Sequence, residues 1–395
     1  MFIRVSLPAV QSAAVFLWLG SIDSCNSKKV KNNVMFLFTE TRKIRYSPFK
    51  YMGGIFMKKK IRFFGAIGVI ICLVLGSGKI FAAAQQEAIT NKPLHLGVSK
   101  IVSHPALDAI EQGMKDYLEE EGFIIQYDSQ SANGDISTAA SIAQKFKADR
   151  ADLVVGIGTP VAQALANVFT ETPVVFGGIT DPLEAGLVPT YEPNDGNVGG
   201  VSDKNPVYDQ IKLFSELTGA KTIGIVYTSG EANGVQLKDM VEKAVKELGL
   251  NFVAAGVSNS AEVKSAILSI VNRIDGLYIG TDNTVVSAIS SLGEVCAEAN
   301  VPLFTADPTS AVDIDYFMVW GFNYYKHGRK TGEAVAAVLN GHKNAGQLGT
   351  IFITEPNDFE LWFNLDVARS LGITIPKDLI DSAAVIHKDG VMITQ

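Results

Sequence analysis

The chain has 395 residues, a formal net charge of −7, and 47% hydrophobic and 19% charged residues, which excludes a disordered or fibrous protein. Its three cysteines lie far apart and its five histidines never fall at a metal-binding spacing, so we expect neither a disulfide scaffold nor a metal site. Residues 1–84 contain 13 Lys and Arg against two acids, which leaves 21 against 39 in residues 85–395. This acidic body excludes a basic nucleic-acid-binding face, and we expect no nucleic-acid partner.

Residues 57–84 have the features of a secretory signal peptide. Lys58–Lys60 form a basic start, residues 63–75 form an apolar run, and three alanines at 82–84 suit cleavage. An uncleaved N-terminal anchor is the alternative. We interpret residues 1–56 as a non-native or mis-annotated extension upstream of a true start at Met57, although the apolar segment 7–19 is an alternative targeting element. The predicted location is the periplasm or the extracellular face of the cytoplasmic membrane.

From Leu94 onward, short apolar strands alternate with amphipathic helices, a pattern typical of α/β folds. In the first series the expected strands are 94–98, 123–127, 153–157, 174–177 and 198–201, and the expected helices are 104–121, 136–148 and 160–169. In the second series the expected strands are 222–227, 251–255, 276–279, 303–305 and 317–320, and the expected helices are 207–217, 235–248, 261–271 and 284–299. A helix at 325–339 and a strand at 351–353 follow.

Two such series predict two Rossmann-like lobes with parallel sheets that face each other across a cleft. The predicted first lobe contains residues 92–204 and 313–346, and the second contains residues 205–312 and 347–395. The chain would then cross between the lobes three times, near residues 202–205, 312–316 and 344–349. Such a cleft closes by hinge motion.

Polar residues directly after the predicted strands are the candidate ligand contacts, because ligands of open α/β sheets bind at the carboxyl ends of the strands. Thr159 is expected to cap a helix that has Pro160 in its first turn, and this helix start suits a carboxylate. Asp282 is expected to pair with a ligand ammonium group, with plain capping by Asn283 or Thr284 as the alternative. The full candidate set is His104, Thr159, Pro160, Thr180, Asp181, Ser229, Glu231, Asn233, Thr281, Asp282, Asn283 and Asp307.

The sequence contains no G-x-S-x-G nucleophile elbow and no GK[ST] phosphate loop. A binding protein needs only a few oriented polar groups in a dry cleft, and the loops supply them. We therefore expect a binding protein without a cofactor rather than an enzyme. Cys296 falls on the apolar side of a helix and is expected to be an inert core residue.

From about residue 92 to 389 the chain resembles the ABC transporter substrate-binding protein family that includes tryptophan/tyrosine-type importers. The matching stretches, in order, are HPALDAIEQGMKDYLEEEGF at 104–123, DLVVGIGTPVAQAL at 152–165, TPVVFGGITDPLEAGLV at 172–188, YTSGEANG at 227–234, TDNTV at 281–285 and GFNYYKHGRKTGEAVAAVLNG at 321–341.

The resemblance implies a type I periplasmic-binding-protein architecture with the ligand in the cleft between the lobes. It also implies an amino-acid ligand, with aromatic amino acids the associated class, and delivery to an ABC permease and its ATPase. We expect a monomer, the default state of a soluble shuttle. A ligand-sensing periplasmic module for a receptor is the alternative. The stretch 312–320 is bulkier than the family pattern, so Trp320 and Phe322 either line the pocket or belong to the core.

Overall fold

The first lobe is built on six parallel strands. The computed structural model describes residues 93–341 and 344–395, so the predicted extension at 1–56 and the predicted signal peptide at 57–84 lie outside the described residues. In this sheet the strand order is β11-β5-β4-β3-β1-β2. Its members are β1 (Leu94–Lys100), β2 (Ile125–Ser131), β3 (Leu153–Ile157), β4 (Val174–Ile179), β5 (Val198–Ser202) and β11 (Thr350–Phe352). Every residue of β3 is buried, as expected for a central strand with both faces covered.

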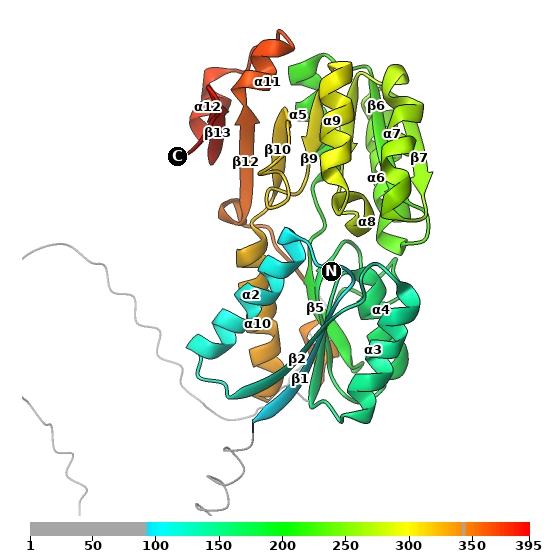
Figure 1. The fold of residues 1–395 in the computed structure, drawn as a ribbon. Coiled ribbons are helices and arrows are strands. Elements are labelled where there is room, and N and C mark those ends of the chain that lie inside the picture. Colours follow the sequence, from blue (N-terminus) through cyan, green and yellow to red (C-terminus); the bar gives the residue numbers. More distant parts are fainter. Residues whose placement is uncertain (1–92, 342–343) are drawn as a thin grey trace, which may run out of the picture. The chain divides into compact units, whose positions relative to one another are not determined.

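Four helices of the described chain cover the first sheet: α2 (Pro105–Glu120), α3 (Ile136–Ala148), α4 (Thr159–Val168) and α10 (Tyr324–Leu339). Helices α2 and α10 lie side by side although they are far apart in the sequence (Figure 1). A Cβ atom added at Gly113 would lie 2.2 Å from the backbone oxygen of Tyr325, and one at Gly328 would lie 2.3 Å from that of Ile110. Only glycine permits this approach, which fixes the start of α10 against the middle of α2.

The second lobe contains an eight-stranded sheet in the order β14-β13-β12-β10-β9-β8-β6-β7. The five strands from β10 to β7 are parallel, whereas β12 runs antiparallel to β10 and β14 antiparallel to β13. The strands are β6 (Thr222–Thr228), β7 (Asn251–Val257), β8 (Gly276–Ile279), β9 (Leu303–Thr305), β10 (Met318–Phe322), β12 (Phe359–Asn364), β13 (Val385–Lys388) and β14 (Val391–Thr394).

Helices cover both faces of this second sheet (Figure 1). They are α5 (Val207–Thr218), α6 (Ala232–Glu247), α7 (Val263–Ile270), α8 (Asn283–Val286), α9 (Ile289–Ala299), α11 (Leu365–Ser370) and α12 (Lys377–Ser382). Cys296 is buried in α9, which confirms a core residue, and burial raises the pKa of its thiol to about 12.

Within the described residues the chain crosses between the sheets three times, as predicted, but two of the predicted crossing points are wrong. Strand β10 pairs with β9 and β12, so residues 318–322 belong to the second lobe rather than the first. Strand β11 pairs with β5, so residues 350–352 belong to the first lobe rather than the second. The crossings therefore follow Ser202, Phe322 and Phe352. Both strands are short apolar runs, and nothing local in such a run specifies which sheet it joins.

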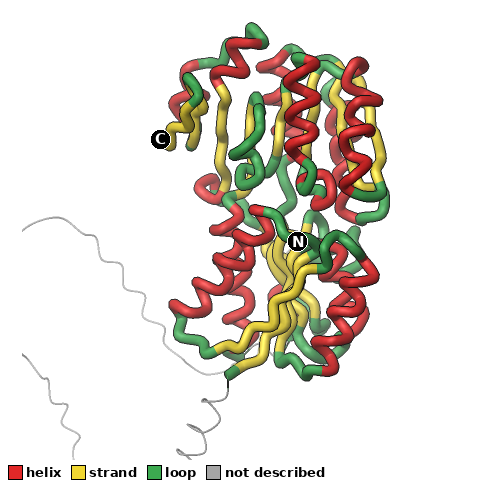
Figure 2. Tube along the Cα trace, in the orientation of Figure 1, coloured by secondary structure: helices red, strands yellow, loops and turns green. Residues whose placement is uncertain are grey.

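The structure confirms an α/β protein with two parallel-rich sheets. The described residues belong to one compact unit, and loops from the two sheets meet where the lobes face each other (Figure 2). Among residues 93–341 and 344–395, no helix is both long and apolar enough to cross a membrane.

Candidate ligand-binding site

A small cavity lies where the two lobes meet. It has a volume of about 10 Å³, which is about the space that one water molecule needs. A ligand larger than water therefore enters only when the lobes move apart. The cavity is lined by His104, Ala106, Leu107, Gly178 and Asp203 from the first lobe, by Thr281, Asp282, Asn283, Val286 and Asp307 from the second, and by Tyr324 at the second crossing.

His104 lies at the start of α2, where it is the N-cap residue and Pro105 occupies the first helical position. The side chain is 9% exposed, and neither ring nitrogen has a hydrogen-bond partner in the described part of the protein. Burial lowers the pKa of His104, and the negative charge of Asp307 opposes this effect. A neutral ring with an unpaired donor and an unpaired acceptor is suited to a polar ligand group.

Asp203 directly follows β5, and the candidate set from the sequence did not include it. Its side chain is 4% exposed. One carboxylate oxygen, Oδ2, accepts a hydrogen bond of 3.3 Å from the Tyr324 hydroxyl, while the other, Oδ1, is buried without a partner in the described chain. Burial raises the pKa of Asp203 to about 7. Asp203 follows a predicted strand, but residues 202–205 are predicted from the sequence only as a hinge crossing between the lobes.

Asp282 connects the end of β6 to the start of α8. Its carboxylate accepts hydrogen bonds from the backbone N–H of Thr228 at 2.6 Å, from the Thr228 hydroxyl at 2.6 Å and from the N–H of Val285 at 3.1 Å. Asp282 is thus the N-cap of α8, and the alternative of capping by Asn283 or Thr284 is wrong. Burial and the neighbouring Glu231 raise the pKa of Asp282 to about 7, although the three hydrogen bonds act to lower it.

Glu231, Asn233 and Thr281 form the second-lobe framework around the cavity. The Glu231 carboxylate accepts hydrogen bonds from the Asn283 amide at 2.8 Å and the Thr284 hydroxyl at 2.5 Å. The Asn233 amide donates to the backbone oxygen of Thr281 at 3.4 Å. Glu231 is the N-cap residue of α6. These bonds hold Asn283 and Thr281 in place at the rim.

Thr180 and Thr281 connect the two lobes directly, because their hydroxyl oxygens lie 3.3 Å apart in hydrogen-bond contact. Asp307, after β9, is 2% exposed, and its Oδ1 accepts from the backbone N–H groups of Thr309 and Ser310. Burial raises the pKa of Asp307, and His104 opposes the increase. The two lobes therefore place an acid and a histidine against each other across the cavity.

The start of α4 differs from the expectation in one respect. Gly158 is the N-cap residue, with a φ of 93° that favours glycine, and Thr159 is the first residue of the helix. The prediction that Thr159 is the cap is therefore wrong. Pro160 lies in the first turn, as predicted. The Thr159 hydroxyl is buried without a partner among the described residues, which leaves it free to bind a ligand.

Seven of the twelve candidate residues do not line the cavity: Thr159, Pro160, Thr180, Asp181, Ser229, Glu231 and Asn233. Two of them, Asp181 and Ser229, make contacts elsewhere. Asp181 lines a different groove of about 620 Å³, and its carboxylate accepts from the Tyr191 hydroxyl and the Lys204 ammonium group. Ser229 is exposed and donates to the backbone oxygen of Val257. The structure thus assigns both a local structural contact.

Trp320 and Phe322 do not line the cavity. Phe322 is 1% exposed, and its ring centroid lies 4.4 Å from that of Phe359. The core interpretation of Phe322 is confirmed.

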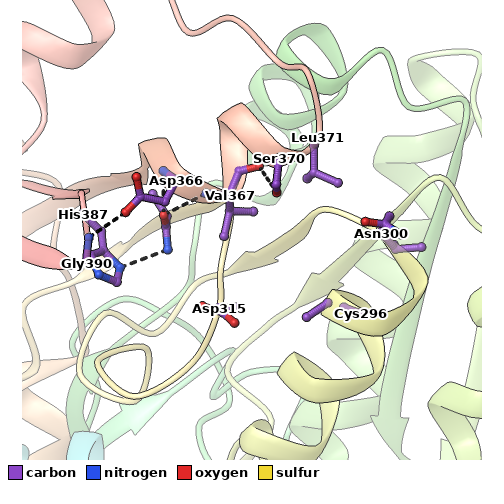
Figure 3. Close-up of a pocket in the computed structure, with 12 residues that line it drawn as sticks. Cys296, Asn300, Asp315, Asp366, Val367, Ser370, Leu371, His387 and Gly390 are labelled. Atoms are coloured by element: carbon purple, nitrogen blue, oxygen red, sulfur yellow. Dashed lines mark hydrogen bonds between the residues drawn. The ribbon is translucent and has the colours of Figure 1, made fainter.

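A second pocket lies within the second lobe, between α9, α11 and β13 (Figure 3). It has a volume of about 360 Å³, and Cys296, Asp366 and His387 are among its lining residues. In the described ranges no group of three or more His, Cys, Asp or Glu side chains is placed to hold a metal ion. This pocket shares no lining residue with the cavity between the lobes.

Residues 95–387 match the family model for ABC transporter substrate binding proteins. The tyrosine-binding protein of Clostridioides difficile is 34% identical over 77% of this chain and 91% of its own length. The structure of an ABC domain in complex with L-Trp from Streptococcus pneumonia is 31% identical, covers 75% of this chain and 100% of that one, and superimposes with a TM-score of 0.70.

Two further structures inform the arrangement of the lobes and the fold. A ligand-free, open substrate-binding protein with adhesive properties from Clostridium difficile is 34% identical, covers 72% of this chain and 97% of that one, and has a TM-score of 0.56. A leucine-binding protein from Thermotoga maritima is 12% identical, covers 76% and 97%, and shares the fold alone with a TM-score of 0.54. The chain therefore belongs to the ABC transporter substrate-binding protein family and has the type I periplasmic-binding-protein architecture.

Proposed function

We propose that the protein captures an aromatic amino acid, tryptophan or tyrosine, between its lobes and delivers it to the permease of an ABC importer that an ATPase drives. The observation that carries this proposal is the interlobe cavity, which combines buried polar groups of both lobes with unpaired atoms on His104 and Asp203. The two relatives that bind tyrosine and L-Trp support the ligand class. Capture would take place on the outer side of the cytoplasmic membrane.

The arrangement of the lobes supports capture by closure. The chain matches the L-Trp complex with a TM-score of 0.70 but the open, ligand-free protein with only 0.56, although the two are 31% and 34% identical to it. Because the two relatives are about equally similar to this chain in sequence, the difference between their TM-scores indicates a difference in lobe arrangement. The lobes of this protein are arranged more like those of the L-Trp complex. The cavity of about 10 Å³ agrees with closely apposed lobes.

The groups around the cavity match the parts of an amino acid. A carboxylate needs donors, and the His104 ring at the cavity has an unpaired one. The start of α4 lies close by, since a Cβ atom at its N-cap Gly158 would be 3.6 Å from Oδ1 of the lining residue Asn283, and it brings the positive end of the helix dipole. Leu107, Val286 and the Tyr324 ring supply apolar contacts for a side chain. Closure would exclude water from these contacts, which strengthens each of them.

Isothermal titration calorimetry with L-Trp, L-Tyr, L-Phe, L-Leu and L-Glu tests the proposal. We expect the aromatic amino acids to bind and L-Glu not to bind. His104→Ala should weaken binding by about three- to tenfold, as expected for one lost hydrogen bond. His387→Ala, in the second pocket, is the matched control and should bind as the wild type does. Binding of none of the five amino acids, or tightest binding of L-Leu or L-Glu, would contradict the proposed ligand class.

A further inference from the structure

We propose that Asp203, oriented by Tyr324, binds the ammonium group of the ligand, and that Asp282 has a structural role instead. This assignment rests on the proposed function to the extent that an amino acid occupies the cavity. It replaces the interpretation from the sequence, in which Asp282 pairs with the ammonium group.

The first argument is the hydrogen-bond inventory of the three acids that line the cavity. Asp282 accepts three hydrogen bonds from Thr228 and Val285, and Asp307 accepts two at one oxygen from the turn that follows it. Asp203 accepts one long bond from Tyr324, and its second oxygen is buried without a partner in the described chain. A buried acceptor without a donor is costly, so Asp203 is the acid that gains most from a ligand N–H.

The second argument is charge. Three acids and one histidine line the cavity, and none of its described lining residues is Lys or Arg. His104 does not supply a compensating charge, because burial lowers its pKa. Buried carboxylates are normally paired with a cation, and an ammonium group brings one positive charge and three donors. A zwitterionic or cationic amine therefore matches the cavity, whereas a plain carboxylic acid does not.

The third argument is position. Asp203 lies in the first crossing between the lobes and Tyr324 at the second, so their contact joins two of the three hinge segments. Asp203 is also fixed from the first-lobe side, because its backbone N–H donates to the oxygen of Ile179. An ammonium group bound here contacts the segments that must bend on closure. The positive charge of the ligand is thus bound at the hinge.

The charged and titratable neighbours of Asp203 agree with this assignment. Its pKa is raised by burial and by Asp307, whereas the Tyr324 hydroxyl, the backbone N–H of Asp203 itself and the Thr180 side chain act in the opposite direction. Tyr324 in turn has a pKa well above its ordinary value because of burial and of Asp203 and Asp307, so the phenol stays protonated and donates. A positive group between these partners would favour the ionised carboxylate.

The test uses the wild type, Asp203→Asn, Tyr324→Phe and Asp307→Asn as the matched control in the same cavity. Calorimetry is performed with L-Trp, with tryptamine, which keeps the ammonium group, and with indole-3-propionate, which lacks it. We expect Asp203→Asn to weaken L-Trp and tryptamine binding by roughly thirtyfold or more, as for other buried charge pairs, and Tyr324→Phe to weaken both by several fold. Asp307→Asn should have the smallest effect, and indole-3-propionate should bind poorly to the wild type.

Several results would overturn the assignment. These are wild-type affinity of Asp203→Asn for L-Trp, a larger loss in Asp307→Asn, or equal binding of indole-3-propionate and L-Trp to the wild type. Thermal melting shows whether each variant folds. If Asp203→Asn does not fold, Tyr324→Phe still tests the assignment. If the wild type binds another amino acid of the panel, that one replaces L-Trp in the test. If the wild type binds none of the amino acids, the proposed function fails together with this assignment. If the wild type binds an amino acid and Asp203→Asn binds it equally well, only this assignment fails.

Discussion

The buried carboxylate of Asp203 predicts that the unliganded protein closes more readily at low pH. In the open form this side chain would be solvated, with a pKa near its ordinary value of 3.8, whereas burial between the lobes raises its pKa to about 7. The closed form therefore binds a proton that the open form does not hold at neutral pH. Closure is favoured below pH 7, and this contribution is lost as the pH rises through 7.

The magnitude follows from these two pKa values. At pH 8 and at pH 5 the open form is almost fully ionised. The closed form is mostly ionised at pH 8 and mostly protonated at pH 5. The contribution of Asp203 to the ratio of closed to open protein should therefore rise by about one to two orders of magnitude between pH 8 and pH 5, which is a few kcal/mol. His104, whose pKa is lowered by burial, contributes in the opposite direction. In Asp203→Asn this contribution disappears, and closure at pH 8 becomes easier.

Energy transfer between two fluorophores measures the closure. The labels are attached to cysteines introduced at Glu171 in the first lobe and Glu298 in the second, both of which are exposed. Cys25 and Cys72 are replaced by serine, while Cys296 stays because its buried thiol, with a pKa near 12, is unreactive. Transfer should increase from pH 8 to pH 5 in the wild type without ligand. The reasoning is refuted if transfer does not change with pH, or if Asp203→Asn shows the full wild-type change.

Three further predictions concern the framework of the site. Asp282→Asn places an amide N–H against the Thr228 donors and should lower the free energy of unfolding by about 1 to 3 kcal/mol in chemical denaturation; an unchanged value would remove its structural role. Gly328→Ala, which would press into the backbone of α2, should cost about 1 to 3 kcal/mol in the same assay, whereas Gly230→Ala, with open space around it, should cost little. Glu111 is mostly buried, which alone would raise its pKa, but the adjacent lysines lower it to about 2; it therefore stabilises the fold above pH 4.5 and loses this effect as the pH falls toward 2. Glu111→Gln should accordingly cost about 1 to 3 kcal/mol at pH 7 and almost nothing at pH 2, and an equal cost at both would contradict the ion-pair explanation.

Local chemistry explains why much of the site could be predicted. The rule that ligands bind after parallel strands found His104, Thr281, Asp282, Asn283 and Asp307, all of which line the cavity. Each is close in sequence to an apolar strand and an amphipathic helix, so its position at a strand end follows from periodicity alone. The capping residues were harder to predict, because several polar residues in each loop are chemically suitable for the cap.

The errors share a different cause, which is long-range pairing. Strands β10 and β11 were assigned to the wrong lobes because their partners are decided by pairing between strands distant in sequence. Asp181 was a candidate ligand contact and Asp203 was not, but tertiary contacts with Tyr191 and Lys204 satisfy the Asp181 carboxylate. Which acid remains without a hydrogen-bond partner depends on tertiary contacts, so it cannot be predicted from the sequence of the loop alone.

The role of a hinge residue illustrates this point further. A segment that joins two lobes is usually regarded as a connection, whereas Asp203 would make the first crossing part of the binding site. The fold itself does not choose the ligand, since a leucine-binding protein shares it at 12% identity. In this chain the excess of acids around the cavity penalises closure without a cation, because each buried carboxylate loses its solvation. A ligand that supplies the missing positive charge at the hinge therefore stabilises the closed form, and a neutral or anionic molecule of the same shape does not.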